Sequence, residues 1–168
     1  TNNGTYEDTG ATQTHTYSNA GTYNLKLRVE DNDGDTATKT KTVEVPDVNN
    51  VDITIDNVGS NAWKVTSVSG NESEVASIGK ENPDIKLQNN TRYTITNNGH
   101  SDHPLEIFDS NEDALLSQSG SGTFEDDSEV NWVDNGGTLK FTVTQNLYNE
   151  LNGYVCTVHG NMEGAIIQ

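Results

Sequence analysis

Apolar and polar residues alternate in many short segments of this 168-residue chain, and turn-forming residues separate the segments. The pattern is clearest in residues 23–29, where every second residue is apolar. Successive side chains of a β-strand point to opposite faces of a sheet, so this spacing predicts strands with one buried face. The sequence therefore predicts an all-β fold.

The chain is strongly acidic, with 26 acidic and 9 basic residues and a formal net charge of −17. Binding to nucleic acid needs clustered Lys and Arg that neutralise phosphates, so this balance excludes it. The same balance argues against docking on an anionic membrane surface. Only 30% of the residues are hydrophobic, which together with high charge is also typical of disordered chains. The strand alternation favours a folded protein adapted to strong brine, of the kind that halophilic archaea export, since salt screens self-repulsion there.

Three further features restrict how the chain is held together and where it acts. No apolar run is long enough to span a membrane as a helix, so we expect no direct membrane insertion. The sequence begins at Thr1 without a signal-peptide pattern, which suggests a processed or cut start. Cys156 is the single cysteine, so an intramolecular disulfide is impossible and the core must be held by packing or by a metal.

Residues 1–46 are predicted to form a first domain. Strands over residues 23–29 and 36–45 flank a turn-forming acidic cluster and make a β-hairpin. The stretch His15-Thr-Tyr-Ser-Asn-Ala-Gly-Thr-Tyr23, followed by Leu-Arg-Val-Glu-Asp and Gly34, resembles the second half of the polycystic-kidney-disease (PKD) domain family. The resemblance implies a partial immunoglobulin-like β-sandwich that serves as a spacer on a cell-surface protein.

Half of such a sandwich exposes one face of a sheet and its unpaired edges. Upstream residues, the second domain or another subunit could cover them. The sequence does not indicate which of these three covers the sheet. Formation of a homo-oligomer and donation of a strand by a neighbouring subunit therefore both stay open.

After a linker at residues 47–50, residues 51–168 are predicted to form a second domain. Its turn-separated strands are typical of a sandwich or a barrel. The predicted strands cover residues 51–55, 62–68, 84–87, 92–96, 105–108, 139–143, 153–157 and 165–167. One helix is expected after Thr144, which can cap it, with Leu147 and Leu151 four residues apart on one face.

The second domain carries a candidate metal site. Cys156, His159 and Met162 follow one another at intervals of three, and His103 lies upstream. Strand alternation places both His103 and Cys156 on core-facing positions. A thiolate, two imidazoles and a weak thioether are the ligand set of a type 1 (blue) copper site. Zinc is the alternative metal because Cys and His also suit it, but the methionine argues against zinc.

Each of these residues alone would be read as core or surface, and only the joint spacing favours copper. A lone cysteine or methionine in a β-protein is usually a buried apolar residue. His100 lies three residues before His103, and its polar turn favours a surface position over a role as ligand.

The second domain resembles the cupredoxin family, in particular plastocyanin and amicyanin. The resemblance rests on the Asn-rich turn before His103, on the Cys-x-x-His motif at Cys156, and on the short, amicyanin-like spacing to Met162. Stretches such as Asn82-Pro-Asp-Ile and Tyr154-Val-Cys-Thr-Val-His look like haloarchaeal surface-attached members. The cupredoxin resemblance implies a Greek-key β-sandwich, one type 1 copper per chain and one-electron transfer without enzymatic activity.

Two details of the cupredoxin resemblance concern the surroundings of the metal. In related proteins the edge of the C-terminal histidine reaches solvent among apolar residues, which implies an electron-exchange patch of Val158, Gly160 and Pro104 here. Residue 104 is proline where plastocyanin-like proteins often have asparagine. Because proline has no backbone N–H, it cannot donate to the cysteine sulfur.

These observations predict an extracellular or cell-surface electron-transfer protein with an unknown redox partner. The alternative is a structural subunit of a surface layer or filament, in which the metal stabilises the fold or is simply captured. Three sequons, at Asn3, Asn71 and Asn89, are candidate N-glycosylation sites in an extracellular protein.

Overall fold

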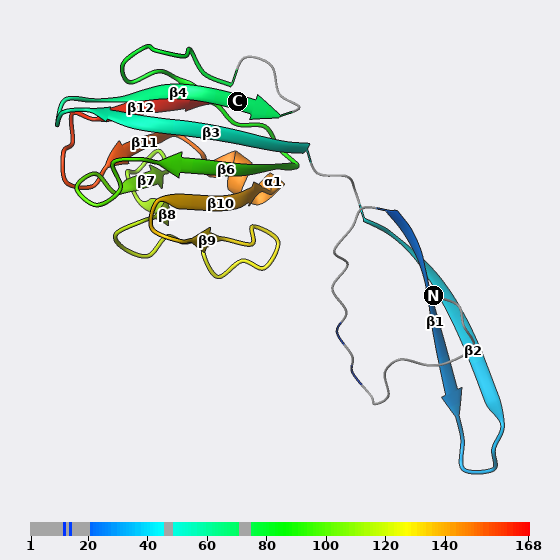
Figure 1. The fold of residues 1–168 in the computed structure, drawn as a ribbon. Helices are drawn as coiled ribbons and strands as arrows, with labels where there is room; N and C mark the ends of the chain where they lie inside the picture. The colour runs from blue at the N-terminus through cyan, green and yellow to red at the C-terminus, as the bar shows by residue number, and fades with distance from the viewer. Residues whose placement is uncertain (1–11, 13, 15–20, 46–48, 71–74) are drawn as a thin grey trace. The chain divides into compact units, whose positions relative to one another are not determined.

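The computed structural model describes residues 12, 14, 21–45, 49–70 and 75–168 (Figure 1). The chain divides into two compact units, residues 1–47 and residues 48–168. Strand β3 of the second unit begins at Asn49, within the range that the sequence assigned to the linker. The first two sequons, at Asn3 and Asn71, lie outside the described residues.

The described part of the first unit is a hairpin of two long strands, β1 (Gly21–Glu30) and β2 (Thr36–Val45). They pair antiparallel over their whole length, as the sequence predicts. The turn is closed by Asp31, whose carboxylate accepts hydrogen bonds from the backbone N–H groups of Asp33 and Asp35. Three apolar side chains of β1 remain exposed, those of Leu25, Leu27 and Val29.

The described part of the second unit is a sandwich of two five-stranded sheets. The first sheet has the order β4-β3-β6-β10-β9, with bounds Ala62–Gly70, Asn49–Val58, Thr91–Asn97, Thr138–Val143 and Val133–Asp134. The second has the order β5-β12-β11-β7-β8, with bounds Ile85–Lys86, Glu163–Ile167, Gly153–Cys156, Leu105–Phe108 and Ala114–Ser117. The pairs β3–β6 and β5–β12 are parallel and the other pairs are antiparallel. The predicted all-β sandwich is therefore confirmed.

The inward-facing side chains of both sheets form one hydrophobic core. Strand β6 shows the reason most clearly, because its burial alternates residue by residue. Tyr93 of β6 stacks on Phe141 of β10, with ring centroids 5.8 Å apart. Ile107 and Tyr154 come from the opposite sheet, and each is at most 3% exposed.

The predicted helix is also present, as α1 (Gln145–Glu150). The Thr144 hydroxyl accepts a hydrogen bond from the N–H of Leu147, which caps the helix as expected. Strands β8 and β9 were not predicted. Residues 115–117 of β8 are all buried, so the strand shows no alternation, and β9 is only two residues long.

Candidate metal centre

The predicted ligands come from two loops at one end of the sandwich. His103 lies near the end of the loop that connects β6 to β7, and Cys156 is the last residue of β11. His159 and Met162 lie in the loop between β11 and β12. Because β11 pairs antiparallel with β7, Cys156 stands opposite Leu105, two residues after His103. The register of these two strands therefore brings residues far apart in sequence to one place.

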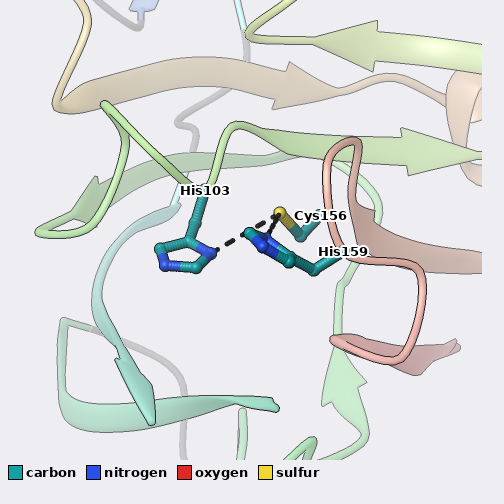
Figure 2. A group of neighbouring side chains, drawn as sticks. All are labelled: His103, Cys156 and His159. Atoms are coloured by element: carbon teal, nitrogen blue, oxygen red, sulfur yellow. Dashed lines mark hydrogen bonds between the residues drawn. The ribbon is translucent and has the colours of Figure 1, made fainter. Parts of the chain in front are cut away.

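Figure 2 shows the two imidazole rings turned toward the cysteine sulfur. Cys156 Sγ lies 3.8 Å from Nδ1 of His103 and 3.7 Å from Nδ1 of His159. One ligand atom from each of the three residues lies within 4.8 Å of the others. Metal bonds to imidazole nitrogen and thiolate sulfur are about 2.0–2.3 Å long, so atoms at these separations can share one ion. His103, Cys156 and His159 thus form a group that could hold a metal.

The three side chains differ in exposure. Cys156 is 1% exposed and His103 is 7% exposed, whereas His159 is half-buried. The histidine rings lie 4.7 Å apart between centroids, tilted by 39°. The site is therefore closed on the side of His103 and reaches solvent on the side of His159.

Backbone hydrogen bonds close the loop that carries the other candidate ligands. The N–H of His159 donates to the carbonyl of Cys156, and that of Met162 donates to the carbonyl of His159. The N–H of Cys156 in turn donates to the carbonyl of Met162. Met162 is fully buried. These three bonds fix the backbones of the predicted thiolate, imidazole and thioether ligands relative to one another.

The buried side chain of Asn97 holds the loop that carries His103. Its Nδ2 donates to the carbonyl of His103 and to Oε1 of Gln118, and its Oδ1 accepts from the N–H of Gly99. The same Gln118 oxygen accepts from the N–H of Leu105. The cupredoxin resemblance pointed to the Asn-rich turn, but nothing in the sequence indicated Gln118, because its partners are distant in the chain.

Replacing Asn97 with alanine should destabilise the fold. The change leaves the buried carbonyl of His103 and the part-buried N–H of Gly99 without partners, so we expect the free energy of unfolding to fall by about 2 kcal/mol or more. Urea denaturation checks this. The matched control is Asn98→Ala at the exposed neighbour, for which we expect a change within about 0.5 kcal/mol. Equal effects of the two substitutions would show that the Asn97 side chain does not hold the loop.

In the described part of the chain, the two imidazole nitrogens are the only hydrogen-bonding atoms that reach Cys156 Sγ. Pro104 is near, since its carbonyl accepts from the N–H of Thr157, the residue after the cysteine. As the sequence predicts, proline offers no N–H at this position.

His100 is not a member of the metal-binding group. It is half-buried, and its ring packs closely on the turn at Gly136 and Gly137. A Cβ at either glycine would lie 3.3 Å from a ring nitrogen, which is a tight contact that would press on the ring. His100 is thus more enclosed than the predicted surface position.

The third sequon is exposed. Asn89 is an exposed residue, and its side-chain amide donates to Oε1 of Gln145. A glycan at Asn89 would be attached to the same nitrogen that donates this bond.

Comparison with known proteins agrees with the first half of the sequence interpretation. Residues 1–45 match the PKD domain family. PKD domains are typically found in extracellular or surface proteins. No cupredoxin family model matches, and comparison with curated proteins and with solved structures gives no match. In the described residues, no helix is long and apolar enough to cross a membrane.

Proposed function

We propose that the second unit is a type 1 copper protein that carries one electron at a time and has no enzymatic activity. His103, Cys156 and His159 would hold the metal, with Met162 as the weak fourth ligand. Copper, when bound, supplies a Cu(I)/Cu(II) couple. The observation that carries the proposal is the pair of sulfur–nitrogen separations of 3.7 and 3.8 Å, with a fully buried methionine in the same closed loop.

The donor set favours copper over zinc. A structural zinc site takes four nitrogen or sulfur ligands from Cys and His, and the chain offers one cysteine and four histidines in total. His100 is turned to the Gly136–Gly137 turn and is not in the group. A fourth ligand from Met162 suits copper, which accepts a long thioether bond.

The surrounding protein suits rapid electron exchange because it is rigid. The antiparallel register of β7 and β11, the Asn97 hydrogen bonds and the closed loop of Cys156–Met162 bonds all fix the ligands before any metal binds. Ligands that are held in one arrangement need to move little when an electron arrives or leaves.

A surface for exchange lies over His159. The adjacent Val158 is 63% exposed, Gly160 is exposed and Pro104 is half-buried. The exposed valine beside Gly160 and Pro104, next to the solvent-facing side of His159, supports an apolar contact there with a redox partner, whose identity is unknown. We further propose that the protein acts outside the cell, in line with its PKD match, and that its acidity reflects a halophilic source.

Potentiometric titration tests the proposal and the role of Pro104 together. The wild-type protein with copper should show one reversible one-electron couple. Pro104→Asn introduces a backbone N–H that can donate to the thiolate, which lowers the basicity of the sulfur and disfavours Cu(II). We therefore expect the variant to have the higher reduction potential. A wild-type potential equal to or above that of the variant would contradict this role, and the absence of any reversible couple would contradict electron transfer.

The exposed hairpin supports a second candidate function, as a subunit of a surface assembly. Leu27 and Val29 are 62% and 55% exposed, and in the described residues β1 and β2 pair only with each other. Such a hairpin offers edges and an apolar face to strands of a neighbouring copy. Size-exclusion chromatography in strong salt distinguishes the two candidate functions. Ordered assemblies would favour the role as a surface subunit, and monomers would disfavour it.

A further inference from the structure

Asn82 has a backbone conformation that most residues avoid. It lies between β4 and β5 with φ = 45°, in the left-handed region that asparagine tolerates better than most residues. Its N–H donates to the carbonyl of Trp63 at 2.7 Å, and its Oδ1 accepts from the N–H of Trp63 at 2.8 Å. Its Nδ2 donates to the carbonyl of Asn161 at 3.0 Å. One side chain thus connects two segments that are far apart in sequence.

Both segments adjoin the metal-binding group. Asn161 lies between His159 and Met162, in the loop that carries both. Trp63 is fully buried, and its ring stands edge-on to that of His103, with centroids 6.0 Å apart and planes at 75°. Asn82 is therefore hydrogen-bonded to Trp63, whose ring packs on His103. It is also hydrogen-bonded to the loop that carries His159.

Further hydrogen bonds hold this arrangement in place. The side-chain amide of Asn161 donates to the carbonyl of Asn61, just before β4. The buried hydroxyl of Tyr154, two residues before Cys156, donates to the carbonyl of Pro83. The segment that begins at Asn82 is thus anchored to the cysteine strand as well.

We propose that Asn82 is a positioning residue for the metal centre: its amide holds the loop of His159 and Met162 against the strand that carries Trp63. The inference rests on the proposed metal site and adds to it a residue that touches no ligand directly. Asn82 would fix the position of the loop. It would thereby set where the Met162 sulfur lies relative to the other ligands, and so influence the reduction potential. A loop that loses this bond keeps its three internal hydrogen bonds and the bond from Asn161 to the carbonyl of Asn61, but it is held less firmly against the strand that carries Trp63.

The test is Asn82→Asp. The substitution keeps the size of the side chain and an acceptor for the N–H of Trp63, but replaces the amide donor with an oxygen that repels the carbonyl of Asn161. In the copper-loaded protein we expect an altered ratio of the thiolate-to-copper absorption bands and a shifted potential, with one copper still bound. In the metal-free protein we expect amide hydrogen exchange at Cys156 and Met162 to be faster by about tenfold.

Asn131→Asp is the matched control, because Asn131 is exposed, has φ = 49° and undergoes the same change of charge. Asn82→Gly, which permits the same φ and removes the side chain, is the second variant in case the aspartate prevents folding. The inference would be overturned if both Asn82 variants had the same spectra, reduction potential and exchange rates as Asn131→Asp. That result would not contradict the proposed copper site. A wild-type protein without a thiolate-to-copper band would refute the proposed function instead. In that case, unchanged exchange in the metal-free variants still overturns the positioning role, and faster exchange supports it.

Discussion

At low ionic strength the protein is expected to lose most of its stability. Residues 48–168 contain 18 acidic and 5 basic residues, and in the described residues the only ion pair is Arg28–Glu30, in the other unit. The carboxylates are thus left to repel one another. The Debye length is about 30 Å at 0.01 M salt and about 3 Å at 1 M, so added salt removes most of this repulsion. Thermal unfolding followed by circular dichroism should show a midpoint that rises steeply over this range of KCl concentration.

A variant with three fewer negative charges separates repulsion from a general effect of salt on apolar burial. Asp126→Asn, Glu129→Gln and Glu150→Gln remove three charges at exposed positions. The combined variant should be more stable than the wild type at low salt and should depend less on salt. If the wild type melts at the same temperature at both ionic strengths, its acidity is not an adaptation to brine.

Cys156→Ser is expected to abolish the proposed copper centre. Serine has nearly the size of cysteine, but its hydroxyl cannot supply the soft thiolate that the site places between the two imidazoles. Even residues that only support a metal ligand are worth about 10–100-fold in affinity, so we expect the affinity for copper to fall by more than about 100-fold. Competition with a chelator of known affinity measures the change.

Met162→Leu is the companion variant to Cys156→Ser. Leucine preserves burial and removes the thioether, so copper should remain bound with an altered spectrum and a shifted potential. An unchanged affinity in Cys156→Ser, with the circular dichroism of the wild type, would show that the cysteine is a core residue and not a ligand.

Local sequence patterns were sufficient to predict most of the fold. Strand β7 begins and ends where predicted, because residues 105–107 alternate and turns flank the segment. Helix α1 was predictable from its threonine cap and the spacing of its leucines. Strand β8 was not, because a strand with three consecutive buried residues has no alternation to detect.

The grouping of the candidate ligands was predictable in the same way. The hydrogen bonds that hold their loops in place were not. The Cys-x-x-His spacing placed two residues in one loop, and strand alternation turned His103 toward the core. The contacts of Gln118 and Asn82 depend on which loops meet at the end of the sandwich. Asn82 lies 79 residues from Asn161, and no local pattern reports a contact over that distance.

Thiolate ligation of copper is seen directly in the electron paramagnetic resonance spectrum of the protein after one equivalent of Cu(II) is added in strong salt, with a visible spectrum of the same sample. Copper bound by the thiolate of Cys156 and by Nδ1 of His103 and of His159 predicts an intense blue band and a narrow copper hyperfine splitting, because the unpaired electron is shared with sulfur. A colourless sample with the wide splitting of copper bound only to nitrogen and oxygen, or no bound copper, would contradict the account.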